Sequence, residues 1–237
     1  MNIKDLTNKI INADCMDILK QLPDKCIDLV LTDPPYGINC DGGDYGLGVS
    51  PKKIQKKEWD NGIPQRQIFD EIFRISKNQI IFGGNYFTDY LKPTKAWICW
   101  DKIGSYKLKN NFSECELVWT SFKKVTKKYT YIQQGFICSD SNENLTRFHP
   151  TQKPLKLFEM ILNDYSKKGD LILDCFSGSG TTAIACHNLN RRFICLEKDY
   201  DYWKASVERL ENAKSQLNLF TNIEQPKEEI TEQAKLF

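Results

Sequence analysis

The sequence predicts an α/β protein with a doubly wound, mostly parallel sheet. Two observations lead to this prediction: apolar strand-like segments alternate with helical segments, and a glycine-rich loop stands between a strand and a helix near residue 178. Alternation of this kind is typical of βαβ units, in which helices cover both faces of a parallel sheet. The chain has 237 residues, 41% of them hydrophobic, so we expect one domain with a single core.

Near-continuous apolar runs predict the strands, because a strand buried on both faces of a parallel sheet has little polar surface. Apolar residues at helical spacing, such as Ile68, Ile72 and Ile75, predict the helices. We expect strands at residues 9–12, 26–33, 78–85, 96–102, 116–122, 171–176 and 191–199. We expect helices within residues 13–22, 65–76, 146–170, 180–189 and 200–217.

The composition argues against several classes of protein. The net charge is +2, so a polyanionic partner must be met by local basic patches. The nine cysteines show no CxxC spacing, and the chain has only His149 and His187, so we predict no metal site and reduced thiols, Cys175 included, that mostly fill the core. The sequence has no apolar run of membrane-spanning length and no signal-peptide core in "MNIKDLTNKI". We therefore expect a soluble, cytoplasmic protein without a membrane partner.

The glycine-rich loop "LDCFSGSGTTA" has the spacing of a nucleotide-binding loop. Gly178, Gly180 and Ala183 match G-x-G-x-x-G/A between a predicted strand and a predicted helix. The glycines permit positive φ and close approach of a ligand to the backbone. Thr181 and Thr182 are candidates to cap the helix that follows. The alternative is an ordinary tight turn between a strand and a helix.

Two acidic residues near this loop refine the interpretation. Glu197 ends the next strand, where a carboxylate can accept hydrogen bonds from two ribose hydroxyls. The loop alone is compatible with a nicotinamide cofactor. However, the loop begins with Asp174, and a carboxylate there suits the ammonium of a ligand better than a pyrophosphate.

A second motif, "DPPY" at residues 33–36, directly follows a predicted buried strand. Pro34 and Pro35 fix their own φ angles, bias the preceding residues toward extended backbone and have no N–H. The Asp33 carboxylate and a nearby carbonyl therefore form a rigid set of acceptors beside the Tyr36 ring. Such a set suits a planar amine with two N–H donors, such as the exocyclic amine of a base, and accepting both bonds would localise the nitrogen lone pair. The alternative is a stiffened turn whose acid caps a local group.

The segments "TDPPYG", "HPTQKP" and "LDCFSGSGTT", in this order, resemble the amino-methylating DNA methyltransferases. The order, with the catalytic motif before the glycine loop, is similar to that of the circularly permuted β group. "NADCMDIL" and "FICLEKDYDYWKASVERL" also match the family pattern, so the resemblance covers residues 9 to about 212. It implies a Rossmann-like methyltransferase fold, with an antiparallel strand near one edge of the sheet, and S-adenosylmethionine as cofactor.

The resemblance also implies roles for residues at matching positions. Glu197 would bind the ribose, and Asp14 would lie near the adenine edge of the cofactor. The base flipped out of double-stranded DNA would be held by Asp33, Pro34, Pro35 and Tyr36. The remaining cofactor contacts would come from the loop and from "HPTQKP": Asp174, Phe176, Ser177, Gly178, Gly180, Thr181 and Thr182, with His149, Thr151 and Lys153 near the methionine carboxylate.

The family modifies adenine N6 or cytosine N4, and an aspartate at the first motif position usually accompanies adenine. We therefore expect N6-adenine methylation, of the kind used in bacterial or bacteriophage restriction–modification, with a cytosine-N4 enzyme as the alternative. The target base must leave the helix stack, and its amine then attacks the sulfonium methyl. Two other classes are less favoured: a nicotinamide oxidoreductase, because of Asp174 and "DPPY", and a non-catalytic DNA-binding module, because both motifs are intact.

Two lysine clusters are candidate DNA contacts, with a solvated surface as the alternative. They comprise Lys52, Lys53, Lys56 and Lys57, and Lys123, Lys124, Lys127 and Lys128. Residues of about 122–147 lie where the family places its target-recognition segment. That segment is short, which favours a short recognition sequence or help from a second subunit in a homodimer. Trp59 is either a wedge or stacking residue for DNA or part of a small local core.

We expect residues 1–215 to form one methyltransferase domain with a mobile loop at about 40–64, followed by a polar tail at 216–237. "QLNLF" (Gln216 to Phe220) and "QAKLF" (Gln233 to Phe237) resemble the Gln-x-x-Leu-Phe peptide that docks on bacterial sliding clamps. The alternative for Leu217, Leu219 and Phe220 is packing at the end of the last helix.

Overall fold

The computed structural model describes residues 2–39, 57–106, 113–134, 137–140, 149 and 151–223. Most of the predicted loop at 40–64, part of the predicted recognition segment and the tail from residue 224 lie outside this range. The "QAKLF" segment and Lys52, Lys53 and Lys56 therefore lie outside the described residues.

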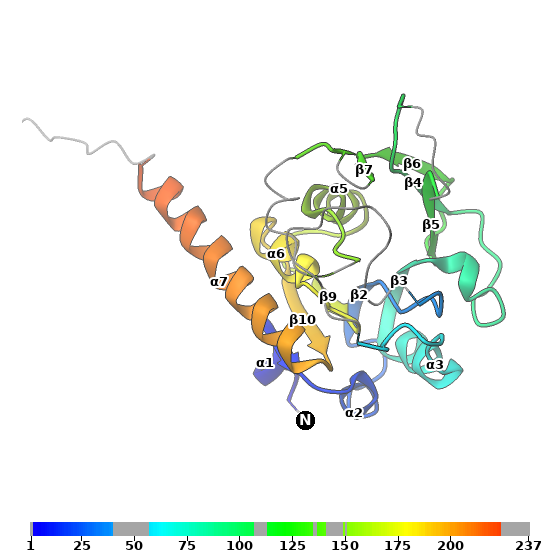
Figure 1. The fold of residues 1–237 in the computed structure, drawn as a ribbon. Helices are drawn as coiled ribbons and strands as arrows, with labels where there is room; N and C mark the ends of the chain where they lie inside the picture. The colour runs from blue at the N-terminus through cyan, green and yellow to red at the C-terminus, as the bar shows by residue number, and fades with distance from the viewer. Residues whose placement is uncertain are drawn as a thin grey trace, which may run out of the picture.

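The centre of the molecule is an eight-stranded sheet in the order β1-β10-β9-β2-β3-β5-β4-β6 (Figure 1). Within this sheet β5 alone runs antiparallel to its neighbours, β3 and β4, and the other pairs are parallel. The predicted fold class, including the antiparallel strand near one edge, is confirmed. The strands are β1 (Lys9–Asn12), β2 (Ile27–Thr32), β3 (Ser76–Phe82), β4 (Ile98–Asp101), β5 (Cys115–Thr120), β6 (Lys127–Thr130), β9 (Leu171–Asp174) and β10 (Arg192–Glu197); β7 (Gln133–Gln134) and β8 (Ile137–Cys138) form a separate hairpin.

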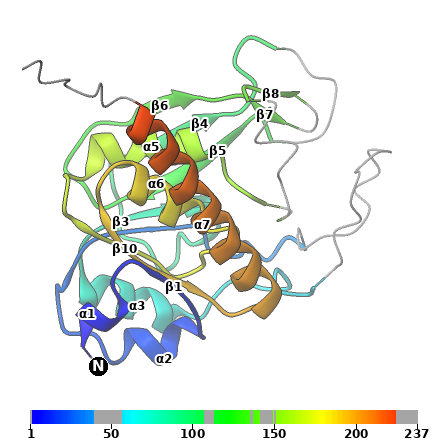
Figure 2. The same cartoon turned by 90° about the vertical axis from the view of Figure 1, so that its left-hand side faces the viewer.

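Helices cover both faces of the sheet (Figures 1 and 2). On one face α5 (Leu155–Tyr165), α6 (Thr181–Asn188) and α7 (Tyr200–Ile223) pack over a core that includes Leu31 and Phe82. On the other face α1 (Ile3–Leu6), α2 (Cys15–Leu19) and α3 (Arg66–Ile75) pack over a core that includes Val30. A short 3-10 helix, η1 (Gly84–Tyr86), follows β3. The result is the three-layer arrangement that alternating strands and helices predict.

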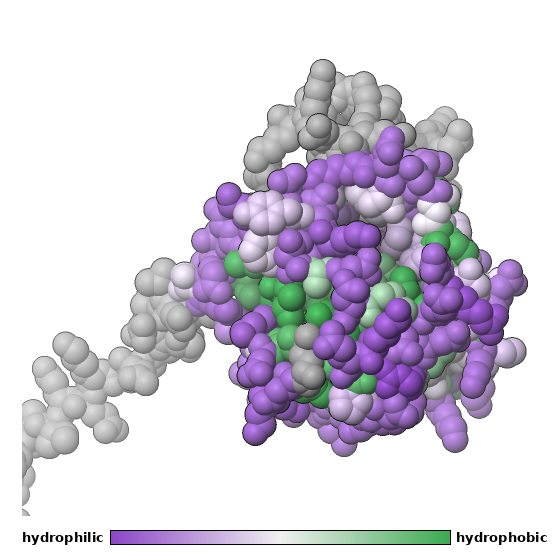
Figure 3. All heavy atoms as spheres, turned by 90° about the horizontal axis from the view of Figure 1, so that it is seen from below, coloured by the Kyte–Doolittle hydropathy of each residue, from purple (hydrophilic) through white to green (hydrophobic). Residues whose placement is uncertain are grey.

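Apolar side chains are concentrated in these two cores and in a smaller cluster of Phe69, Ile81, Phe87 and Trp119. The Phe82 and Phe158 rings stack between β3 and α5 with centroids 5.1 Å apart, and Cys15, Cys175, Cys186 and Cys195 are buried free thiols. Seen from below, the surface is mostly hydrophilic, with apolar side chains gathered toward the middle (Figure 3). Within the described residues, no helix combines the length and the apolar character needed to cross a membrane.

Several boundaries differ from the sequence prediction by a few residues, and two of the differences have a local cause. Strand β3 ends at Phe82, three residues early, because Gly83 adopts φ +63° and turns the chain into η1. Helix α7 continues to Ile223, past the predicted boundary at residue 215, because residues 216–223 contain no glycine or proline. The "QLNLF" segment is therefore helical backbone rather than an extended tail.

The topology brings the predicted site residues together at one edge. Strands β1, β10, β9 and β2 are parallel neighbours, so their carboxyl ends share an edge of the sheet. Glu197 ends β10 and Asp174 ends β9, while Asp14 follows β1 and Asp33 follows β2. Ligands of doubly wound sheets bind outside the carboxyl ends of the strands.

Candidate active site

A cavity of about 1030 Å³ lies at this edge of the sheet. Pro34, Tyr36 and Gly180 adjoin lining residues in the chain but are not part of the lining themselves. The predicted site residues that line it are Asp14, Asp33, Pro35, His149, Thr151, Lys153, Asp174, Phe176, Ser177, Gly178, Thr181, Thr182 and Glu197. The structure thus joins the "DPPY", "HPTQKP" and glycine-loop motifs around one space, as large as the upper range of ligand sites.

Both oxygens of the Asp33 carboxylate accept a hydrogen bond. The Tyr36 hydroxyl donates to Oδ1 at 2.6 Å, and the Lys153 ammonium donates to Oδ2 at 2.5 Å. Burial raises the pKa of Asp33, and the positive charge of Lys153 offsets only part of that rise. The prolines after Asp33 contribute no N–H that would compete for the carboxylate. Asp33 is therefore a fixed acceptor at the wall of the cavity.

The Tyr36 ring is held by the turn after β3. It stacks on Tyr86 with centroids 4.8 Å apart and an interplanar angle of 13°. Gly83 approaches so closely that a Cβ there would lie 2.2 Å from the Tyr36 ring. The sequence predicts that Tyr36 stacks on a target base; in this structure its ring stacks on Tyr86, and its hydroxyl is bonded to Asp33.

Lys153, which the resemblance places near the methionine carboxylate, lines the cavity and contacts two carboxylates of the protein. It is buried, with an exposed fraction of 8%, between Asp33 and Glu116, at 2.5 Å and 3.4 Å respectively. Glu116 in turn pairs with Lys102 at 3.2 Å. Sequence analysis did not single out Glu116 or Lys102; the available signal was a glutamate within the otherwise apolar strand "ELVWT".

The glycine loop has the backbone that its spacing predicts. Gly178 and Gly180 have φ angles of +50° and +74°. A Cβ at Gly178 would meet the His149 ring at 3.4 Å, so the bare glycine keeps the space beside His149 open. Gly180 itself is the N-cap of α6, and no side chain caps the helix. The expectation that Thr181 or Thr182 caps it is therefore wrong, because both hydroxyls bond elsewhere, to Lys153 O and to Asp174.

Glu197 faces the same loop. Its Oε2 accepts a hydrogen bond from the Gly178 N–H at 2.7 Å, and its Oε1 accepts from the Asp199 N–H at 2.8 Å. Burial raises its pKa, although these two backbone N–H groups act against the rise. Each oxygen retains a lone pair for a ligand hydroxyl.

Asp174 accepts hydrogen bonds from three protein donors. Its Oδ1 accepts from the Thr32 hydroxyl at 2.7 Å and from the Phe176 N–H at 3.1 Å, and its Oδ2 accepts from the Thr182 hydroxyl at 2.5 Å. Burial raises its pKa to about 6. Its carboxylate thus ties β2, β9 and α6 together, in addition to lining the cavity.

Asp14 is the N-cap of α2. Its Oδ1 accepts from the Met16 N–H at 3.0 Å, and its Oδ2 accepts from the Lys198 ammonium at 2.9 Å. The hydrogen bond from Lys198 is the main cause of its lowered pKa. This contact fixes the acid at the cavity beside β1.

An aromatic cluster closes the cavity near the glycine loop. The His149 ring lies between Trp59 and Tyr202, with centroid distances of 5.3 Å and 4.3 Å. Lys57 lies over the Tyr202 ring and pairs with Asp199 and Asp201, each at 2.7 Å. Trp59 therefore packs against His149 at the wall of the cavity.

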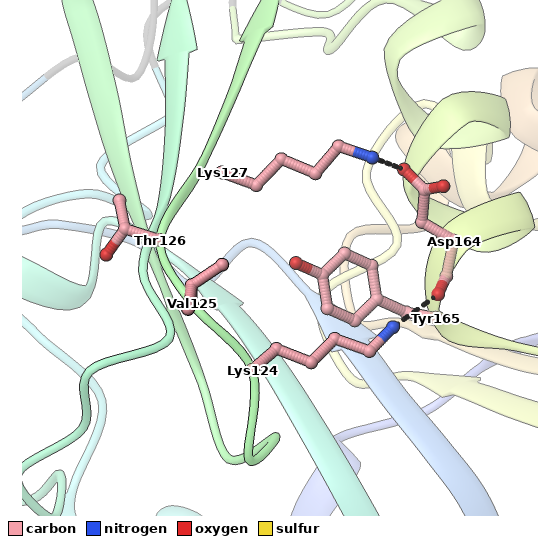
Figure 4. A pocket seen from close by; sticks show the side chains of 6 residues that line it. All are labelled: Lys124, Val125, Thr126, Lys127, Asp164 and Tyr165. Carbon is pink, nitrogen blue, oxygen red and sulfur yellow. Dashed lines mark hydrogen bonds and ion pairs between the residues drawn. The ribbon is translucent and has the colours of Figure 1, made fainter.

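The second lysine cluster contacts acidic groups of the protein. Lys124 donates to the Asp164 carbonyl at 2.7 Å, and Lys127 pairs with the Asp164 carboxylate at 2.5 Å, beside a cavity of about 330 Å³ (Figure 4). Lys128 pairs with Asp101 at 3.2 Å. Asp164 lies in the last turn of α5, roughly 14 Å along the helix from the end near Lys153. DNA would have to compete with these contacts.

A sheet covered by helices on both faces, with a glycine loop and acidic residues at the strand ends, is the arrangement of the Rossmann-like methyltransferase fold. Among solved structures, the chain superposes on the complex of M1.HpyAVI with S-adenosylmethionine with a TM-score of 0.55, 23% identity and coverage of 85% of this chain and 99% of the other. It also superposes on the cytosine-N4-specific PvuII DNA methyltransferase with a TM-score of 0.55, 18% identity and coverage of 90% and 92%.

The sequence comparisons define the family. A family model described as DNA methylase matches residues 66–208, and the chain belongs to this family of N6-adenine and N4-cytosine methyltransferases. Type II methyltransferase M.HpaI of Haemophilus parainfluenzae is 27% identical over 93% of this chain and 78% of its own length. Type II methyltransferase M.HinfI of Haemophilus influenzae is 26% identical over 92% and 72%. The protein is a DNA methyltransferase, and S-adenosylmethionine is its cofactor.

The residues at the cavity fit this cofactor. The space beside His149 would be filled by a Cβ at Gly178, and the Glu197 carboxylate, which is suited to two ribose hydroxyls, borders the same loop. The Asp33 carboxylate lines the same cavity. Asp33 and the glycine loop therefore border one space.

Proposed function

We propose that this protein methylates the N6 amine of adenine in double-stranded DNA after flipping the base out of the helix. The observation on which this proposal rests is the position of Asp33, whose carboxylate lines the same cavity as the glycine loop. A base in a duplex cannot reach such a cavity while it is stacked. The cofactor supplies a methyl group already activated by a sulfonium charge, so the protein acts mainly by positioning and electrostatics.

We assign the roles from the donors and acceptors at the cavity. Asp33 and a nearby proline carbonyl accept hydrogen bonds from the target amine and localise its lone pair, while Tyr36 borders the base. The Glu197 carboxylate binds the ribose, and Asp14 lies near the adenine of the cofactor. The cradle for the rest of the cofactor is formed by Asp174, Phe176, Ser177, Gly178, Gly180, Thr181, Thr182, His149, Thr151 and Lys153.

Adenine is favoured over cytosine by the residue at the first motif position. An aspartate there usually accompanies adenine in proteins that this chain resembles, and here the aspartate is Asp33. The fold does not discriminate, because the cytosine-N4-specific PvuII enzyme superposes as well as M1.HpyAVI does. The identity of the methylated nucleoside decides between the two.

The Asp33→Ala variant tests the assigned site. We expect it to lose methyl transfer while its affinity for S-adenosylmethionine stays within a few-fold, because the carboxylate touches the target amine and the glycine loop holds the cofactor. The control is Asp70→Ala, on the exposed side of α3, which should retain full activity. Substantial turnover by purified Asp33→Ala would remove Asp33 from the mechanism.

The localisation, the motif order and the partners are inferred from the sequence. We propose that the protein is a cytoplasmic enzyme with the motif order of the β group. We also propose that the lysine clusters contact DNA phosphates. The recognition segment at about 122–147 reads a short sequence or is completed by a second copy of the chain. A sliding clamp would bind "QAKLF", because "QLNLF" lies in α7, where a helical backbone disfavours an extended docking peptide.

A further inference from the structure

Lys153 carries a buried positive charge between two carboxylates. Its side chain is 8% exposed, and those of Asp33 and Glu116 are 17% and 19% exposed. Its ammonium donates to Asp33 Oδ2 at 2.5 Å, whereas Glu116 Oε2 lies 3.4 Å away. The ammonium is therefore hydrogen-bonded to Asp33 rather than to Glu116.

Glu116 Oε2 has no hydrogen bond. It is buried and, within the described part of the chain, accepts from no donor. The other oxygen, Oε1, is held by the Lys102 ammonium at 3.2 Å. Burial raises the pKa of Glu116, but Lys153 and Lys102 outweigh this effect and hold the pKa below its usual value. An ionised carboxylate thus stands next to Lys153, and its Oε2 pairs with the ammonium at 3.4 Å without a hydrogen bond, which is costly for a buried oxygen.

The contacts of Asp33 conflict with its proposed role. In the proposed role Asp33 accepts one N–H of the target amine, but its Oδ1 and Oδ2 already accept from Tyr36 and Lys153. Each oxygen keeps a lone pair, yet a base that enters must share the carboxylate with an ammonium, whose positive charge weakens it as an acceptor. Removing Lys153 from Asp33 without giving it a new partner would leave an unpaired charge in a buried place, which is strongly unfavourable.

We propose that Glu116 is a positioning residue that receives the Lys153 ammonium when the target amine binds Asp33. The difference between 3.4 Å and hydrogen-bond length is under one ångström, which a small rotation of a lysine side chain can cover. Lys102 anchors Glu116 on β5, so that the acceptor stays in place while Lys153 moves. The inference rests on the proposed function of Asp33, and it adds a residue that family matching did not suggest.

The Glu116→Gln variant removes the charge of the receiving acceptor. Binding is measured to a duplex with adenine at the target position and to the same duplex with purine, which lacks the 6-amine, both in the presence of S-adenosylhomocysteine. The recognition sequence comes from sequencing modified DNA of the expression host. We expect about tenfold weaker binding of the adenine duplex, and binding of the purine duplex within twofold of the wild type.

Two further variants separate this role from a merely structural one. In a Lys153→Gln background no ammonium has to move, so adding Glu116→Gln should change the adenine-to-purine preference less than twofold. Glu159→Gln is the matched control, because Glu159 is 16% exposed and pairs with Lys156 at the same 3.4 Å but does not line the cavity. It should leave the preference unchanged.

Three outcomes would overturn the inference. The first is that Glu116→Gln weakens binding of the adenine duplex and of the purine duplex equally. The second is that it does not weaken binding of the adenine duplex. The third is that the effects of Glu116→Gln and Lys153→Gln on the adenine-to-purine preference are fully additive. The second outcome would mean that the Lys153 ammonium moves to an acceptor other than Glu116, such as the carboxylate of the cofactor. The role of Asp33 is tested separately, by the methyl-transfer activity of Asp33→Ala. Because that test measures turnover and not duplex binding, its failure can be distinguished from the three outcomes above.

Discussion

At the scale of single residues, the buried carboxyl of Asp174 connects several elements of the site and makes the free energy of unfolding depend on pH. Its carboxylate accepts from Thr32, Thr182 and Phe176, and burial raises its pKa to about 6. Below about pH 4 it is protonated in both the folded and the unfolded chain. As pH rises toward 6 the unfolded chain releases the proton first, so stability falls; above about pH 6 both forms are ionised and the decrease is complete.

We therefore expect the free energy of unfolding to fall by up to about 3 kcal/mol through Asp174 between pH 4 and pH 6. Asp174→Asn cannot ionise, and its amide can still accept from Thr32 and Phe176 while donating to Thr182. Urea unfolding of both proteins without cofactor, across this range, isolates the effect as the difference between their pH profiles. Parallel profiles would show that Asp174 does not titrate there.

The sequence indicates Asp33, Glu197 and the glycine loop because each stands at the carboxyl end of a predicted strand, and such ends meet at one edge. It does not indicate the pairing of Lys153 with Asp33 and Glu116. Those three residues come from three separate segments of the sequence, and their side chains meet only in the fold. Similarly, one of the hydrogen bonds to Asp174 comes from a hydroxyl of β2, far away in the sequence.

At the scale of elements, the turn from β3 into η1 supports the catalytic segment. Gly83 has φ +63°, and a Cβ there would lie 2.2 Å from the Tyr36 ring. Gly169 also has a positive φ, of +83°, but a Cβ there meets nothing within 4 Å. Alanine substitutions at the two glycines therefore distinguish the destabilisation caused by backbone strain from that caused by a steric clash.

Gly169→Ala should cost about 1–2 kcal/mol of stability through its φ angle and leave methyl transfer unchanged. Gly83→Ala should cost roughly 1–3 kcal/mol more and lower the rate of methyl transfer, because it displaces Tyr36 from Asp33. Urea unfolding and initial rates measure the two effects. Equal stability and equal rates in the two variants would mean that the turn does not position Tyr36.

Strands and helices with strong apolar patterns are predictable, and the predicted strand at 26–33 contains β2 (Ile27–Thr32), in which five of the six residues are buried. Strand β6 is not predictable from its pattern, because "KKYT" has one buried residue, Tyr129, among exposed ones. Such an edge strand is stabilised by pairing with β4 rather than by its own burial. The extension of α7 to Ile223 was not predictable, because the polar composition of the last residues is equally typical of a tail without regular structure.

At the scale of the whole molecule, a nearly neutral protein must bind DNA through local charge. Replacing Lys123, Lys124, Lys127 and Lys128 with alanine should reduce the slope of log affinity against log salt by about one unit for each phosphate that the variant no longer neutralises. The control removes four exposed lysines near the amino ends of β1 and β9: Lys4, Lys9, Lys167 and Lys168. An unchanged slope would leave these lysines only their contacts with Asp164 and Asp101.

The central claim is that Asp33 presents an acceptor to the amine of adenine. The most direct measurement is mass spectrometry of nucleosides from DNA of a host without its own DNA methyltransferases that expresses this protein, with Asp33→Ala as the negative control. The account predicts N6-methyladenine in the DNA of cells with the wild-type protein, and none with the variant. N4-methylcytosine in place of N6-methyladenine would contradict it.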